Sequence, residues 1–286
     1  MAASMNMQGV VVVTHGVDIG QAANALRAWG ATVSANPEGA LNIHLVSYGD
    51  ALAVITNPDA APTAWLRTPP NPAWLVTAVQ TAVELLVAQQ ARNESAALLE
   101  ICRTMGSVHE LDALNRLIVR KARELTNADA GSLYLLESAD GERQLRFAVA
   151  QTGPQDAETH TGEVLALTDS SIAGCVAMSG KAIRVSDVYA DLPSEHIAFD
   201  SSFDRSTGYH TKSVLCVPVR DANDRIAGVL QLINRKPTFE AVLPAGVLTT
   251  ELVVPFDEHD EELLTALAAQ AGVLLENARL IRSSSE

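Results

Sequence analysis

The sequence predicts a mixed α/β (α+β) fold in which a central antiparallel sheet is flanked by helices. The first observation is the stretch 213–235, where two apolar strands are joined by Asp221-Ala222-Asn223-Asp224, residues that favour tight turns. The second is the three-four spacing of apolar residues over 72–105 and 258–286, which predicts long N- and C-terminal helices. The third is the four-valine run 10–13, which opens a small N-terminal α/β region.

The composition narrows the classes of partner. The formal net charge is −14, which argues against nucleic acid and anionic membrane surfaces, because both are bound by clustered Lys and Arg. No apolar run reaches the roughly 18–20 residues that span a bilayer, and no signal-peptide pattern opens the chain. Cys102, Cys175 and Cys216 lack metal-binding spacing. We therefore expect a cytoplasmic protein without a membrane partner or a metal site, and no cofactor is indicated with certainty.

Residues 1–7 are expected to be disordered, and 8–65 to form the small α/β region. The order of its elements resembles a fragment of the receiver domain of bacterial response regulators. Receivers hold Mg²⁺ with an acidic pair after the first strand, where this chain has Thr14-His15. We expect a region of unknown role, with a degenerate receiver as one interpretation. Its predicted elements are strands at 10–13, 41–48 and 51–56 and a helix at 20–31.

A linker and a long signalling helix, residues 66–105, are expected to follow. Four prolines between residues 62 and 72 disfavour both helix and strand. The helix is then predicted from about residue 72 to 105, with one apolar side that packs against a partner helix. That side consists of Val76, Val79, Val83 and Leu86.

A second helix is predicted after Gly106, which ends the first one. Ser107 and Glu110 match a capping box, in which each side chain bonds the backbone of the other residue, and the helix should end near Thr126. Its basic residues are expected to face solvent: Arg116, Arg120, Lys121 and Arg123.

The domain core, residues 106–257, alternates strands with turns. A long polar segment, 192–209, is a candidate lid over a binding site. The C-terminal part, 258–286, keeps a four-three alternation of apolar residues, which predicts a coiled-coil helix and a parallel homodimer. The predicted strands lie at 131–137, 145–151, 181–185, 214–219, 226–233 and 248–254, and a short helix lies at 171–177.

A motif closes the second central strand. The strand ends in Asn234-Arg235, and Phe256 comes after twenty intervening residues. Three further residues separate Phe256 from Asp260-Glu261. This arrangement resembles a signature of the GAF family of small-molecule-sensing domains, in the branch found in cyclic-nucleotide phosphodiesterases and some bacterial cyclases. The resemblance covers about residues 92–282 and implies a GAF-like sheet. It also implies that Arg235, which replaces the branch's lysine, pairs with Asp260 and closes the pocket.

The short helix at 171–177 is expected to border the ligand. The first amides of a helix lack helical acceptors and carry the positive end of its dipole, so they can hold a cyclic phosphate without Arg or Lys. The resemblance implies that Ile172 and Ala173 offer these amides. The other predicted ligand contacts are Ser132, Gln151, Phe199, Phe203, Asp204, Thr207, Thr211 and Gln231. The alternatives are a turn for Thr207, an ion pair with Arg205 or Lys212 for Asp204, and a bond to a buried backbone group for Gln231.

One position departs from the resemblance. The cyclic-nucleotide branch carries an aromatic residue on the second strand that stacks on the purine, where this chain has Ala150-Gln151. Stacking is worth about 1–3 kcal/mol per base, so its loss would cost roughly one to two decades of affinity. Phe199 or Phe203 of the predicted lid is a candidate replacement.

We therefore expect a regulatory, non-enzymatic GAF domain of a signal-transduction protein that binds a small molecule, with cAMP or cGMP as the leading candidate. Binding should order 192–209 and shift the last helix, which passes the change to an output domain or partner protein. The alternatives are a sensor of another small molecule and a ligand-free dimerisation scaffold. An enzyme is not expected, because His259-Asp260 has no companion metal ligands and no nucleophile-elbow pattern occurs.

Overall fold

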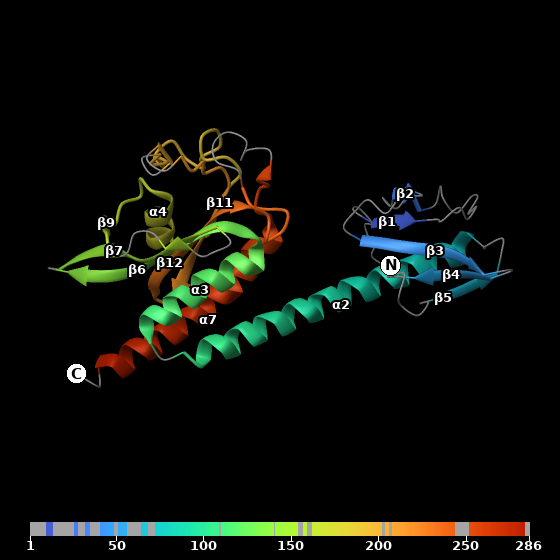
Figure 1. The fold of residues 1–286 in the computed structure, drawn as a ribbon, viewed down its shortest axis with the longest axis horizontal. Helices are drawn as coiled ribbons and strands as arrows, with labels where there is room; N and C mark the ends of the chain where they lie inside the picture. The colour runs from blue at the N-terminus through green and yellow to red at the C-terminus, as the bar shows by residue number, and fades with distance from the viewer. Residues whose placement is uncertain are drawn as a thin grey trace. The chain divides into compact units, whose positions relative to one another are not determined.

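A computed structural model of the chain divides into two compact units, Met1–Ala97 and Leu98–Glu286, which are described one at a time (Figure 1). Helix α2 (Pro72–Gly106) contributes residues to both units. The residues that the structure describes are 10–13, 26–27, 32–34, 41–48, 51–55, 64–67, 72–108, 110–139, 141–153, 157–158, 162–201, 204–205, 208–243 and 252–283.

The first unit contains a five-stranded sheet in the order β2-β1-β3-β4-β5. Strand β1 pairs in parallel with β2 and β3, whereas β3, β4 and β5 pair antiparallel. The receiver fold has the same strand order in a parallel sheet, so the antiparallel half is not that of a receiver. The strands are β1 (Val10–Val13), β2 (Thr32–Ser34), β3 (Leu41–Tyr48), β4 (Ala51–Ile55) and β5 (Ala64–Arg67).

Two predictions for this unit need correction. The proline-rich linker was expected to exclude strands, but β5 forms at 64–67 because none of these four residues is proline. The apolar side of α2 was expected to pack against a partner helix, but it packs against the sheet of this unit. Val76, Val79 and Val83 are buried in one cluster with residues of β1, β3 and β4, and Leu86 packs against it. Of the helix predicted at 20–31, only Leu26–Arg27 is described, as helical, and predicted disorder at 1–7 lies outside the described residues.

The second unit contains a seven-stranded antiparallel sheet in the order β10-β11-β12-β6-β7-β8, with β9 also paired to β7. Strand β12 lies between β11 and β6, as its nearly continuous apolar sequence predicted. The strands are β6 (Ala128–Ala139), β7 (Glu142–Thr152), β8 (Ala157–Glu158), β9 (Val164–Ala166), β10 (Ile183–Val185), β11 (Val214–Arg220) and β12 (Ile226–Arg235).

Helices cover both faces of this sheet. Helices α3 (Leu111–Thr126) and α7 (Glu258–Ser283) pack on one face, and α4 (Ile172–Ser179) lies over the other (Figure 1). Alternation along β12 serves both layers, because Leu230 and Leu232 join the cluster with α3 and α7 while Val229 joins the cluster with α4. The sheet therefore presents one closed face to the long helices and one face to α4.

The start and the surface of α3 differ from the prediction. Glu110 is the residue that precedes the helix, its side chain makes no capping bond, and the Ser107 hydroxyl donates to the carbonyl of Thr104 instead. The capping box is therefore wrong. Arg123, expected in solvent, is fully buried, whereas Arg116 and Arg120 are exposed.

The apolar alternation of α7 packs against this unit's own sheet. Leu264, Leu267, Ala271 and Ala278 are buried in the cluster that includes β11 and β12, so most of the expected coiled-coil surface is already covered. Of the strand predicted at 248–254, only the last three residues are described, and Val254 alone forms a bridge, to Arg235. No helix among the described residues has the length and apolar character needed to cross a membrane.

Candidate functional site

Helix α4 has two buried residues at its first turn whose backbone amides lack helical acceptors. Ser171 precedes the helix in extended conformation, and its hydroxyl accepts from the amide of Gly174 at 3.0 Å. Gly180 ends the helix with a φ of 65°, a conformation that glycine adopts without strain. The amides of Ile172 and Ala173 have no acceptor among the residues that the structure describes. They carry the positive end of the α4 dipole, so an anionic group is favoured there.

A polar row crosses the sheet face that α4 covers. Cys216, Gln231, Ser132 and Ala150 are direct neighbours on β11, β12, β6 and β7. Gln231 is half-buried, and its amide has no hydrogen-bond partner within the described part of the chain. The amide is not among the fully buried groups without a partner, so it is open to solvent and can serve a ligand as both donor and acceptor.

Gln151 does not belong to this face. It pairs in register with Gly131, and its amide nitrogen donates to the carbonyl of Arg116 on α3 at 3.1 Å. The side-chain oxygen of Gln151 is buried without a partner in the described structure. The prediction of Gln151 as a ligand contact beside Ser132 and Gln231 is therefore corrected, because the strand alternation turns Gln151 toward α3.

Asp204 and Thr211 bind each other. The carboxylate of Asp204 accepts from the Thr211 amide at 2.7 Å, from the Thr211 hydroxyl at 2.9 Å and from the Tyr189 hydroxyl at 2.8 Å. Burial and the Asp204 carboxylate raise the pKa of Tyr189 to about 12, so this phenol keeps its proton. Three of the roughly four acceptor positions of the carboxylate are occupied. The two residues fasten residue 204 to residue 211, and the Asp204 carboxylate keeps about one acceptor position for another donor.

Of the two aromatic candidates, the structure describes Phe199. Phe199 packs edge-on against Tyr189, with ring centroids 5.3 Å apart, and joins the cluster under α4. Tyr189 also stacks on His210 at 5.2 Å. Phe203 and Thr207 lie outside the described residues. Ala150, the first of the two residues at the expected place of a stacking aromatic, is the register partner of Ser132 and has only a methyl side chain.

Asn234 ties the end of β12 to the chain before β11. Its φ of 56° places it in the left-handed region, which asparagine tolerates better than most residues. The side-chain oxygen accepts from the Lys212 amide at 2.7 Å. The side-chain nitrogen donates to the His210 carbonyl at 2.8 Å and to the Tyr209 hydroxyl at 3.2 Å. One buried side chain thus holds positions 209, 210 and 212 of the neighbouring segment.

Arg235 joins the same corner to the start of α7. Its guanidinium lies 3.0 Å from Asp260 Oδ2 and 3.1 Å from Asp257 Oδ2. The two aspartates cap the helix reciprocally, because each amide donates to the carboxylate of the other. Burial raises the pKa of Asp260 despite the arginine. The neighbouring motif residues have separate contacts: Phe256 is buried in the core, and Glu261 pairs with Arg184 at 2.9 Å.

A buried charge network was not predicted. The Lys236 ammonium lies 3.3 Å from Asp129 Oδ1, and the Tyr209 hydroxyl donates to Asp129 Oδ2 at 2.9 Å. Burial, first, and the Asp129 charge hold the pKa of Tyr209 well above its usual value. Arg123 donates to the carbonyls of Asp129 and Gly153. The sequence signal for this network was the basic pair Arg235-Lys236 at the end of β12. Lys236 is buried, whereas Arg235 pairs with Asp260 at the start of α7.

The arrangement is suited to binding. No three His, Cys, Asp or Glu side chains gather as metal ligands would within the described residues. The α4 face combines two helix amides with the Ser132–Gln231 pair, whereas the opposite face is closed by α3 and α7. These groups can hold an anion at one end and the polar edge of a small molecule at the other.

Comparisons with known proteins agree on the family. A GAF domain model matches residues 110–275. The cGMP-specific 3',5'-cyclic phosphodiesterases of Drosophila ananassae and Drosophila virilis are 30% and 29% identical over 198 residues, which are 67% of this chain and only 16% and 20% of those relatives. The GAF domain of a phosphoenolpyruvate-protein phosphotransferase from Coxiella burnetii covers 68% of this chain and 98% of its own, with a TM-score of 0.50 at 17% identity, a likeness of fold alone. The family match extends over more than half of the sequence, and the chain belongs to the GAF family of regulatory and sensory domains.

Proposed function

We propose that this chain is a non-catalytic regulatory domain of a signalling protein, and that it binds a small molecule between α4 and the sheet. The observation that carries the proposal is the pairing of two kinds of unsatisfied group on one face. The amides of Ile172 and Ala173 lack acceptors among the described residues, and Gln231 lacks a partner there. Gln231 is a half-buried polar residue in an otherwise apolar strand, and its free amide is available to a ligand on the face that α4 covers.

A cyclic nucleotide is the leading specific ligand. The relatives that align with 198 residues of this chain are named as cGMP-specific phosphodiesterases, and cAMP has the same cyclic phosphate. The phosphate would accept from the α4 amides without a basic side chain, which suits a protein of net charge −14. Ser132 and Gln231, direct neighbours on β6 and β12, would bond the edge of the base.

A different small molecule is the second candidate, favoured by two observations. Ala150 offers no ring for a purine to stack on, and stacking is worth about 1–3 kcal/mol per base. Asp204 and Thr211 already satisfy each other. A ligand with an anionic group but no purine would lose nothing from either feature. The remaining alternative, a ligand-free dimerisation scaffold, is an outcome of the test below.

The output route that we propose runs through α7 and a parallel homodimer to an output domain or partner protein. Asn234 holds positions 209, 210 and 212, and Arg235 holds Asp257 and Asp260 at the start of α7. A ligand that reorders the segment before β11 therefore acts on residues bonded to α7. The response is limited by how much better the ligand binds one arrangement than the other.

The test is calorimetric titration of the full chain with cAMP and with cGMP, alongside Gln231→Leu. Loss of one charge-assisted or buried hydrogen bond should weaken binding at least about tenfold. The matched control is Gln144→Leu, which replaces a half-buried glutamine near the start of β7, six residues from Ala150. This variant should bind like the unaltered protein.

Binding of neither nucleotide would reject the specific ligand. Native mass spectrometry of the purified protein would then separate a sensor of another molecule, which retains a ligand of discrete mass, from a scaffold. A retained ligand that survives Gln231→Leu unchanged would reject the site itself.

A further inference from the structure

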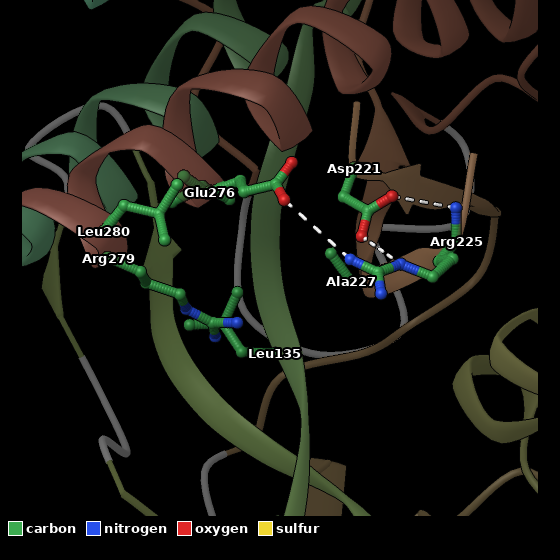
Figure 2. A pocket seen from close by; sticks show the side chains of 8 residues that line it. Leu135, Asp221, Arg225, Ala227, Glu276, Arg279 and Leu280 are labelled. Atoms are coloured by element: carbon green, nitrogen blue, oxygen red, sulfur yellow. Dashed lines mark hydrogen bonds and ion pairs between the residues drawn. The ribbon is translucent and has the colours of Figure 1, made fainter. Parts of the chain in front are cut away.

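A concave site lies away from α4, between the C-terminal half of α7 and the β11–β12 turn. It is an open cavity of about 340 Å³, within the size range of small-molecule sites. Figure 2 shows Glu276, Arg279 and Leu280 reaching it from α7, Leu135 from β6, and Asp221 and Arg225 from the turn. Its apolar walls are Leu135, Ala227, Leu275 and Leu280.

Three of the four charged groups in this cavity satisfy one another. Asp221 accepts from the amides of Asn223 and Arg225, both at 2.9 Å, and from Arg225 Nε at 2.8 Å. Glu276 accepts from the Ala222 amide at 3.0 Å and lies 3.8 Å from Arg225. These contacts hold the turn against α7, and both carboxylates direct these bonds to Arg225 and to backbone amides of the turn.

Arg279 is the exception. Its guanidinium makes no hydrogen bond or ion pair within the described part of the chain, and Figure 2 shows it extending toward Leu135. Burial lowers its pKa, and the nearby charges of Glu137 and Arg146 act in opposite directions. Those two side chains pair with each other at 2.7 Å. A half-buried guanidinium beside Leu135 and Leu280 thus has no carboxylate of the described residues within ion-pair distance.

We propose that this cavity binds a small carboxylate with an apolar body, held by the guanidinium of Arg279. A planar fork of N–H donors matches both oxygens of a carboxylate, and such charge-assisted pairs are stronger than neutral ones. The leucines accept the apolar body, which a fully hydrated inorganic anion lacks. The site uses none of the groups under α4, so it stands or falls independently of the proposed function.

The probe is benzoate, with neutral benzamide as its control of the same shape, titrated into the full chain at pH 7 by calorimetry. Benzoate should bind and benzamide should bind at least about tenfold more weakly, the difference expected from one charge-assisted pair. Arg279→Gln should reduce benzoate affinity by a similar factor, and Arg143→Gln, at an exposed position on β7, should leave it unchanged. Arg279→Lys, which keeps the charge but not the fork, should fall between them.

Leu280→Trp is a second variant that does not alter charge. Leu280 is more than half exposed, so the larger ring is tolerated by the fold while it fills the cavity, and benzoate binding should be lost. Equal affinities for benzoate and benzamide, or equal benzoate affinities for Arg279→Gln and Arg143→Gln, would overturn the proposal.

Discussion

Replacing Gly272 with alanine tests how closely α7 must approach the sheet. A Cβ atom at this position would lie 1.8 Å from the carbonyl oxygen of Arg220 and 2.6 Å from its carbonyl carbon, and Cβ contacts under 3.0 Å essentially never occur. Both obstructing atoms are backbone atoms of β11, so no side chain can rotate away. The helix would have to move off a face that buries Leu267, Ala271 and Leu275.

The magnitude follows from two opposing terms. Forcing extra volume into a packed core costs about 1–3 kcal/mol, whereas alanine is favoured over glycine in a helix by about 1 kcal/mol. The backbone clash places Gly272→Ala at the upper end of the first range, so a net loss of about 1–2 kcal/mol is expected. For a unit of this size each 1 kcal/mol moves Tm by roughly 2–4 °C, which gives a fall of about 2–8 °C.

The assay is thermal unfolding of the full chain by calorimetry, with Gly106→Ala as the matched control. Gly106 ends α2, and a Cβ there would meet nothing within 4 Å, so its substitution should leave Tm unchanged or slightly raised. Equal melting temperatures for Gly272→Ala and Gly106→Ala would refute the close approach of α7 to β11.

Two further predictions concern the corner at the end of β12. Lys236→Met should destabilise the protein by about 3–5 kcal/mol in urea unfolding, because it leaves Asp129 as a buried carboxylate without its cation; a loss below about 1 kcal/mol, typical of a surface pair, would contradict this. Asp257→Asn should flatten the acid limb of the stability curve. Burial raises the pKa of Asp257, but the Asp260 amide and the Arg235 charge together lower it below its usual value. The ionised Asp257 carboxylate therefore stabilises the folded protein above about pH 4, and this stabilisation is lost as pH falls through the folded pKa. Identical acid limbs for Asp257→Asn and the unaltered protein would exclude a stabilising role of the Asp257 charge.

Elements with local signals were predictable from the sequence. The β11–β12 hairpin follows from turn formers between two apolar runs, and Asp221 supplies the turn bonds to Asn223 and Arg225. Helix α4 follows from a serine that caps it and a glycine that ends it. In each case the hydrogen bonds that define the element connect residues within a few positions, so the sequence pattern contains the physical cause.

The failures share the opposite property. Arg123 and Arg120 are three residues apart on one helix, yet only Arg123 is buried, because its partners are the carbonyls of Asp129 and of Gly153, thirty residues away. The apolar side of α7 was correctly recognised, but periodicity does not reveal which surface covers it, and here it is the chain's own sheet. Gln151 was assigned to the wrong face because the register of β7 depends on pairing with β6.

The same distinction explains why sequence reasoning could place the start of α4 but could not assign the side-chain contacts of Asp204. The α4 amides are local, and their place at the helix start followed from Ser171 and Gly180. Asp204 was identified as a polar residue near the site, but its bonds to Tyr189 and Thr211 come from segments on either side of it. Sequence reasoning could therefore select the segment and could not assign its side chains.

The dipeptide Asn234-Arg235 gives the motif a physical meaning beyond closing a pocket. Among the described residues, the Asn234 side chain bonds the segment before β11, and the Arg235 side chain bonds Pro255, Asp257 and Asp260 around the start of α7. Because Asn234 is in the left-handed conformation, the two side chains diverge at once toward different partners. Movement of either partner must strain or break bonds that a single peptide unit holds in common. A ligand that displaces the 204–212 segment therefore changes the stability of the α7 start, and a ligand that leaves the Asn234 bonds intact has no such route to α7.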